Sequence, residues 1–132
     1  MKNILLALFI AVVAGSCTKN LDAGIKNSSQ WVLAEWPNRV IPTAAEATLN
    51  INDGNKIGGK SFCNSYGGTA AFNGNAIQFS QIFGTKMFCQ EVAEAENQFL
   101  ADLESVNSGK IDGRQLSLMK NGQVIMVFNK VK

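Results

Sequence analysis

Hydrophobic and polar residues alternate with a period of two along much of the chain, which predicts β-strands. The clearest case is Ala47–Ile51, which a turn at Asp53-Gly54 joins to a return strand over residues 56–60. In that return strand, Gly58-Gly59 predicts a bulge or a close backbone approach. Further strands are expected over residues 31–36, 69–72, 76–79, 110–112, 115–119 and 124–128, and Asn-Gly pairs mark two of the turns between them.

One segment follows a helical period instead. Between Glu91 and Val106, apolar residues recur three and four positions apart, which predicts a helix with one apolar stripe. Acidic residues at its start suit the positive end of the helix dipole, and Asn107-Ser108-Gly109 supplies a stop. The chain is therefore expected to be a set of strands packed with one helix of about 91–106.

Two tryptophans close together near the first strand could form a binding platform. The alternative is a core Trp31 with a half-exposed Trp36, and it is favoured because aromatic residues dominate small cores. Downstream, Arg39–Pro42 resembles a short edge strand, since proline suits edges and strand starts.

Composition and charge limit the size of the fold and the kinds of partner to expect. The 132 residues suffice for one domain, and 46% hydrophobic with 17% charged residues is typical of a globular protein. A net charge of +2 is too small to indicate nucleic acid as a partner. We expect a monomer.

The N-terminus predicts export. Lys2 precedes a ten-residue apolar run, Ile4–Val13, and small residues then lead to Cys17. A bilayer span needs about 20 residues, so a retained transmembrane helix is disfavoured, as is a buried N-terminal helix. Residues 1–16 are therefore interpreted as a signal peptide.

The small residues before Cys17 resemble a bacterial lipobox, although Ala14 stands where that pattern usually has Leu. The resemblance implies a lipidated Cys17, a membrane anchor, and a polar tether over residues 17–28. Thr18 is not the Asp associated with inner-membrane retention, which favours the outer membrane, facing either the periplasm or the surface.

Cysteine arithmetic agrees with this interpretation. Three cysteines would leave an odd thiol in an oxidising compartment, but lipidation of Cys17 leaves Cys63 and Cys89 as a pair. We expect a structural disulfide, worth about 3–4 kcal/mol in the chain-entropy model.

The sequence offers few of the residues and motifs that catalysis needs. The chain has no histidine, which excludes Ser-His and Cys-His pairs and histidine metal sites. Gly67-Gly68 lacks the Gly-Lys-Ser/Thr of a phosphate loop, and the cysteines form neither a zinc site nor a Cys-x-x-Cys redox motif. Glu91, Glu94 and Glu96 are interpreted as a solvated helix face rather than a metal or acid/base cluster. We expect no enzyme, cofactor or metal.

A resemblance to a known family rests on four motifs in order. These are Phe62-Cys63-Asn64-x-Tyr66-x-Gly68, Ile77-x-Phe79, Thr85-x-Met87-x-Cys89 and Glu96-x-x-Phe99-x-x-x-Leu103. Together they resemble the META domain, or HslJ-like, family, and the likeness covers roughly residues 29–130. The domain is accordingly placed at residues 29–132.

The resemblance implies an α+β fold. We expect a single compact domain in which a curved, partly closed antiparallel sheet of about seven or eight strands packs with one helix. No catalytic residues are defined for the family. Structural roles are therefore expected for its motif residues, which here are Asn64, Tyr66, Gly68, Thr85 and Met87.

The resemblance also implies a bacterial envelope protein, often a lipoprotein, associated with heat induction, antibiotic tolerance, motility or virulence. The family's fold has been likened to that of lipid-binding pilot proteins of type III secretion. The leading hypothesis is a non-enzymatic lipoprotein that binds an envelope protein or apolar ligand and supports stress tolerance. Alternatives are a module that adds a peptide strand at Arg39–Pro42, or a hydrolase with two carboxylates about 5–10 Å apart.

Overall fold

The computed structural model describes residues 21–25 and 28–131. The predicted signal peptide and Cys17 lie outside the described residues.

The described residues form eight strands in one antiparallel sheet, in which neighbours in sequence are neighbours in space. The strands are β1 (Ser29–Glu35), β2 (Thr48–Asn52), β3 (Lys56–Ser61), β4 (Asn64–Asn73), β5 (Ala76–Gly84), β6 (Ser108–Asp112), β7 (Gln115–Lys120) and β8 (Gln123–Lys130). The sheet curls until β8 pairs with β1, whereas β5 and β6 meet only at Ala76↔Ser108. The predicted α+β domain with a curved, partly closed sheet is confirmed.

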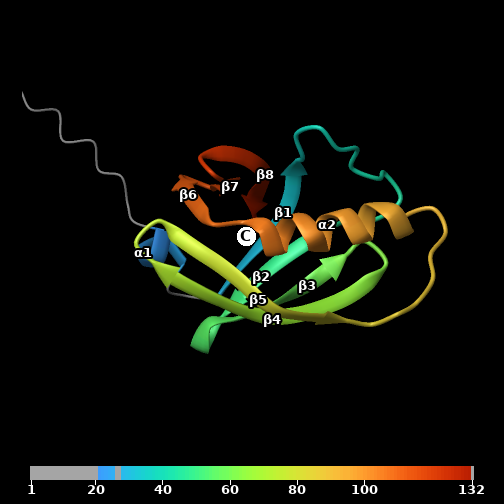
Figure 1. Cartoon of the computed structure of the whole chain (residues 1–132), viewed down its shortest axis with the longest axis horizontal. Coiled ribbons are helices and arrows are strands. Elements are labelled where there is room, and N and C mark those ends of the chain that lie inside the picture. Colours follow the sequence, from blue (N-terminus) through green and yellow to red (C-terminus); the bar gives the residue numbers. More distant parts are fainter. Residues whose placement is uncertain (1–20, 26–27, 132) are drawn as a thin grey trace, which may run out of the picture.

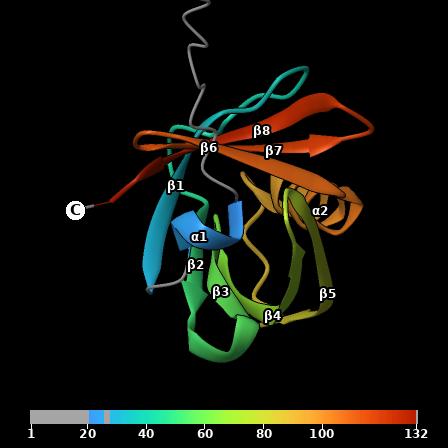
Figure 2. The same cartoon turned by 90° about the vertical axis from the view of Figure 1, so that its left-hand side faces the viewer.

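Helix α2 (Ala93–Ser105) lies alongside β5, which continues past its single pair with β6 (Figures 1 and 2). Its Phe99 is completely buried, and the ring meets those of Tyr66 at 5.8 Å and Phe62 at 5.9 Å. The predicted helix is confirmed. It begins at Ala93 rather than residue 91 because the preceding residues form a turn.

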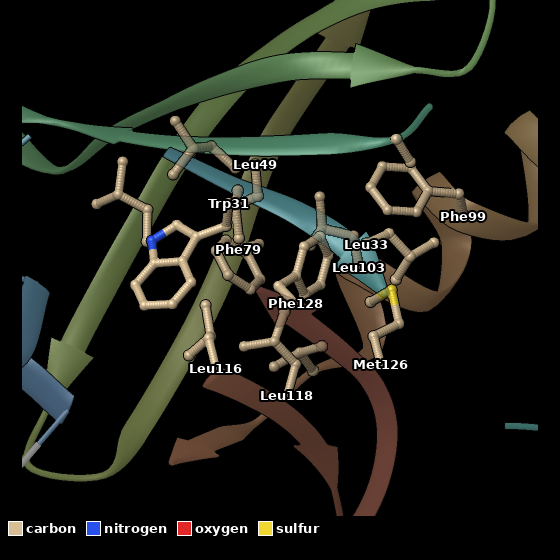
Figure 3. Packing of buried hydrophobic residues seen from close by; sticks show 14 of the residues in the cluster. Trp31, Leu33, Leu49, Phe79, Phe99, Leu103, Leu116, Leu118, Met126 and Phe128 are labelled. Carbon is tan, nitrogen blue, oxygen red and sulfur yellow. The ribbon is translucent and has the colours of Figure 1, made fainter. Parts of the chain in front are cut away.

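The core is built from alternate residues of the strands together with one face of α2. Figure 3 shows side chains from opposite parts of the curved sheet meeting in one cluster. Trp31 is buried, as predicted, and its Nε1 donates to Ser29 Oγ at 2.9 Å. Truncating fully buried side chains such as Leu49 or Phe128 costs about 2–5 kcal/mol.

Gly59 provides the close backbone approach that the sequence predicted. Its φ is 151°, and a Cβ there would collide with the carbonyl oxygen of Thr48. The approach also lets Thr48 Oγ1 accept from the backbone N–H of Lys60 at 2.9 Å. A side chain at position 59 would therefore force β2 and β3 apart.

Trp36 is buried, so the prediction of a half-exposed side chain is wrong. Its Nε1 donates to Asp102 Oδ2 at 2.9 Å, and its ring stacks on Phe62 at 6.0 Å. A partner 66 positions away, on α2, satisfies the indole N–H and so permits burial.

The predicted edge strand at Arg39–Pro42 is also wrong. This segment belongs to the loop between β1 and β2, and Val40 there is 83% exposed. Arg39 reaches across to α2 and forms an ion pair with Asp102 at 3.2 Å.

A short helix, α1 (Leu21–Ile25), lies within the segment expected to be a polar tether. Leu21 and Ile25 are buried in the main core, so this part of the segment belongs to the fold. No helix in the described part of the chain has the length and apolar character needed to cross a bilayer.

Candidate functional site

The site begins at the tight turn between β3 and β4. Phe62 has a φ of 72°, and the N–H of Cys63 donates to Ser61 O at 3.1 Å, which makes a γ-turn of the rare, strained kind. The turn is held because Phe62 N–H donates to Glu46 O at 3.1 Å and the ring is buried against Trp36 and Phe99. Such strain persists only where its surroundings enforce it.

Asn64, the next residue, holds the segment that follows β5. Its Oδ1 accepts from Thr85 Oγ1 and from Met87 N–H, both at 2.8 Å. Its Nδ2 donates to Met87 O at 2.9 Å and to Glu96 Oε1 at 2.5 Å. Both donors and both acceptor positions of this buried amide are thus used.

Glu96 completes the network from the first turn of α2. Its Oε2 accepts from Asn64 N–H at 2.8 Å and from Ser61 Oγ at 3.0 Å. The carboxylate therefore ties the helix to the turn. The prediction that Glu96 belongs to a solvated face is wrong, because its carboxylate is turned towards these donors.

A disulfide adds a covalent link at the same place. Cys63 and Cys89 are joined as the sequence predicted, with their Cα atoms 6.1 Å apart. The bond connects the strained turn to Cys89, at the end of the segment that Asn64 binds through hydrogen bonds. Residues 85–89 are thus fixed at both ends without a secondary structure of their own.

Apolar side chains on this segment and at the end of β5 point outward. Phe83 is 71% exposed, Met87 62% and Phe88 81%. We call these three residues the apolar loop. Grouped exposed apolar side chains of this size are uncommon on a monomer unless they contact something.

Between the apolar loop and α2 lies an open hollow of about 630 Å³. Leu100 and Glu104 of α2 form one wall, and Ile82 and the apolar loop form the other. A second hollow of about 430 Å³ lies beyond Met87 and is lined by Phe62 and Glu91 among others. The disulfide and Met87 stand between the two.

The other motif residues have structural roles. Tyr66 is buried, its hydroxyl donates to Thr48 O at 2.7 Å, and burial raises the pKa of its phenol. At Gly68, a Cβ would lie only 2.9 Å from Ser80 O, so glycine permits the close contact of β4 and β5. Thr85 and Met87 bind Asn64, as described above.

The arrangement offers little for catalysis. Within the described residues, no group of three or more potential ligands could hold a metal ion. Glu96 and Glu104 line the same hollow, but eight helical positions separate their Cα atoms by about 12 Å. Glu96 is also occupied by Asn64 and Ser61. The geometry suits the display of an apolar surface.

Sequence reasoning missed three of the residues that shape this site. Phe83 and Phe88 carried no signal, because a sequence alone does not distinguish an exposed apolar side chain from a buried one. Glu96 carried a signal, because it lies four positions after Val92 and three before Phe99, within the apolar stripe. An acid at such a position is expected to have a partner inside the fold.

Comparisons with known proteins agree with this fold. The family model described as META domain matches residues 23–132. Solved structures with a similar fold include a protein from Burkholderia xenovorans, with a TM-score of 0.74 and 23% identity over 92% of this chain and 94% of that one. Another is a DUF4847 family protein from Bacteroides vulgatus, with a TM-score of 0.58 and 13% identity over 80% and 94%. No curated protein matches the sequence.

Proposed function

This chain belongs to the META domain family, and from that premise we propose that it is a non-enzymatic lipoprotein of the bacterial cell envelope. It is anchored through Cys17 and binds another envelope protein or an apolar ligand. Through that binding it supports tolerance of envelope stress and antibiotics.

The observation that carries the proposal is the exposed apolar loop. Met87 and Phe88 are held in place by the Asn64 network and the disulfide, and Phe83 by the pairing of β5 with β4 at Gly67. A surface that is both fixed and apolar can bind without first paying the entropy of ordering. Its adjoining hollow has a volume in the range of ligand and side-chain pockets.

The anchor is supported by the sequence, and the compartment by the sequence and the disulfide. The apolar run and the small residues before Cys17 fit an exported, lipidated chain. A pair of cysteines joined in a disulfide fits an oxidising compartment such as the periplasm or cell surface. Thr18 favours the outer membrane over the inner one.

The test is a deletion strain complemented with four versions of the full chain: wild type, Phe88→Ser, Cys17→Ser, and Val124→Ser as the control. Val124 is an exposed apolar residue on β8, away from the apolar loop. Survival under detergent, heat and antibiotic is measured, together with the mass of the mature N-terminus. We expect wild type and Val124→Ser to restore survival. Phe88→Ser should fold and be exported but should not restore survival.

Lipidation has its own readout. The mature wild-type chain should begin at Cys17 and carry acyl chains, whereas Cys17→Ser should not. An unmodified N-terminus would reject the anchor, and full survival with Phe88→Ser would reject the binding role of the apolar loop.

A further inference from the structure

The apolar loop and the point where the chain enters the fold lie at opposite ends of the molecule. Figure 1 shows α1 at one end of the long axis and the connection from β5 to α2 at the other, and in the turned view of Figure 2 α1 faces the viewer with α2 behind it. Leu21 of α1 is buried, and its N–H donates to Asn75 Oδ1 at 3.4 Å. The entry point is therefore fixed relative to the apolar loop.

The anchor has a short reach. Only three residues lie between Cys17 and Leu21, so the four residue steps of an extended chain span at most about 14 Å. A domain of this length is roughly 30 Å across. If Cys17 is lipidated, as the proposed function requires, the anchor holds the α1 end near the bilayer and leaves the apolar loop at the distal end.

The charge around the apolar loop is acidic. Helix α2 contains four carboxylates and neither Lys nor Arg. Glu96 is bound to Asn64, and Asp102 to Arg39, but Glu104 at the edge of the hollow is exposed. An anionic lipid surface would repel these groups, whereas a basic partner would be attracted.

Each of the two hollows is bordered by an acidic side chain, and an apolar side chain lies between the two acids. Glu104 borders the larger hollow and Glu91 borders the smaller one, with Met87 between them. Among the residues that the structure describes, Lys86 is the only cation that lines either hollow. A complementary partner therefore carries apolar residues flanked by lysine or arginine.

We infer that the apolar loop is the membrane-distal docking surface for a basic amphipathic segment of another protein in the envelope. Its apolar side chains enter the hollow between Phe88 and Leu100, and its cations face Glu104 and Glu91. This inference rests on the proposed lipoprotein function and narrows its ligand to a protein segment.

The experiment is photocrosslinking in intact cells that express the full chain with benzoylphenylalanine in place of Phe88 or, as the control, Val124. Mass spectrometry then identifies the crosslinked peptide. We expect position 88, but not position 124, to capture one recurrent peptide that is amphipathic and rich in lysine or arginine. Glu104→Lys should lower the yield at least about fivefold, whereas the matched reversal Asp53→Lys on the β2–β3 turn should not.

Three results would overturn the inference: phospholipid crosslinked at position 88, an acidic or purely apolar peptide there, or no product from an exported chain with its disulfide formed. The Cys17→Ser variant distinguishes failure of the docking surface from failure of the anchor. If the wild-type chain proves to be unlipidated but position 88 still captures the basic peptide, the docking surface is supported and only the anchor is rejected.

Discussion

Asn64 and Glu96 are joined twice, once through the side-chain amide and once through the backbone N–H of Asn64, across 32 positions of sequence. The pair connects the β3–β4 turn to the start of α2. Because Asn64 also holds Thr85 and Met87, a single amide fixes the segment that carries Met87 and Phe88 of the apolar loop.

Replacing Asn64 by Asp should therefore be more damaging than replacing it by Ala. Asn64→Ala leaves buried partners unsatisfied, at about 1–3 kcal/mol in unfolding free energy. Asn64→Asp exchanges the donor Nδ2 for a second carboxylate beside Glu96, and two adjacent carboxylates raise the pKa of one of them. The Asp variant should accordingly regain stability as pH falls towards 4, which urea unfolding at several pH values would show.

A double variant provides the control for that prediction. Asn64→Asp combined with Glu96→Gln removes the repulsion but keeps the volume. Its stability should depend less on pH between 4 and 7 than that of Asn64→Asp alone. Equal slopes for the two proteins would show that the pair is not the cause.

The disulfide and Asn64 hold the same segment, so their effects should not add. Replacing Cys63 and Cys89 by serine should lower the unfolding free energy by about 3–4 kcal/mol. Amide exchange should rise first in residues 84–92 and leave the sheet protected. Combining the change with Asn64→Ala should cost less than the sum of the two losses, as measured by a double-mutant cycle.

The fold could be predicted from the sequence because its signals are local. Alternation, Asn-Gly turns and the spacing of Val92, Phe99 and Leu103 each act over a few residues, and they specified the strands and the helix. Motif resemblance added the curvature of the sheet. Burial of Trp36 could not be read in this way, since it depends on Asp102, which approaches only in the folded chain.

The apolar loop shows a second limit of sequence reasoning. Alternation through Ile77 and Phe79, both buried, would place Phe83 on the inner face as well. A bulge intervenes, because Gln81 has a φ of 53° and the register shifts between Gly67 and Thr69 of β4. One extra residue reverses the faces, so Phe83 points outward. The cysteine pair and Asn64, in contrast, were predicted from the number of cysteines and from the family motif.

Asp102 should matter more than Arg39, although the two form an ion pair. Asp102→Ala deprives the buried indole N–H of Trp36 of its acceptor, which costs about 1–3 kcal/mol in unfolding free energy. Arg39→Ala leaves that bond intact and removes a solvent-exposed partner, whose pKa the hydrogen bond to Asp102 raises and whose guanidinium lies 6.0 Å from the centroid of the Trp36 ring. Urea unfolding followed by tryptophan fluorescence compares the two. A loss as large for Arg39→Ala as for Asp102→Ala would contradict this assignment.

Helix α1 should contribute to folding despite its place in the expected tether. Leu21 is fully buried, so Leu21→Ala should lower the unfolding free energy by about 2–5 kcal/mol. Gln30→Ala, at an exposed position of β1, is the control and should change it by no more than about 0.5 kcal/mol. A chain that begins at residue 29 should lose at least as much stability as Leu21→Ala, and calorimetry would detect either change.

Tyr66 should make the protein sensitive to alkali. Burial raises the pKa of its phenol above the ordinary value of 10.0, so the folded state binds the proton more tightly than the unfolded state. Its contribution to stability is therefore complete below pH 10 and is lost at up to about 1.4 kcal/mol per pH unit above it.

Tyr66→Phe lacks the hydrogen bond to Thr48 O and should be less stable by about 1 kcal/mol at pH 7. Tyr66→Phe cannot ionise at this position, whereas the lysines of the variant and of the wild type titrate alike. The unfolding free energies of the two proteins should therefore converge and then cross between pH 10 and 11.5. Parallel curves over that range would mean that the phenol ionises equally easily in the folded and unfolded states.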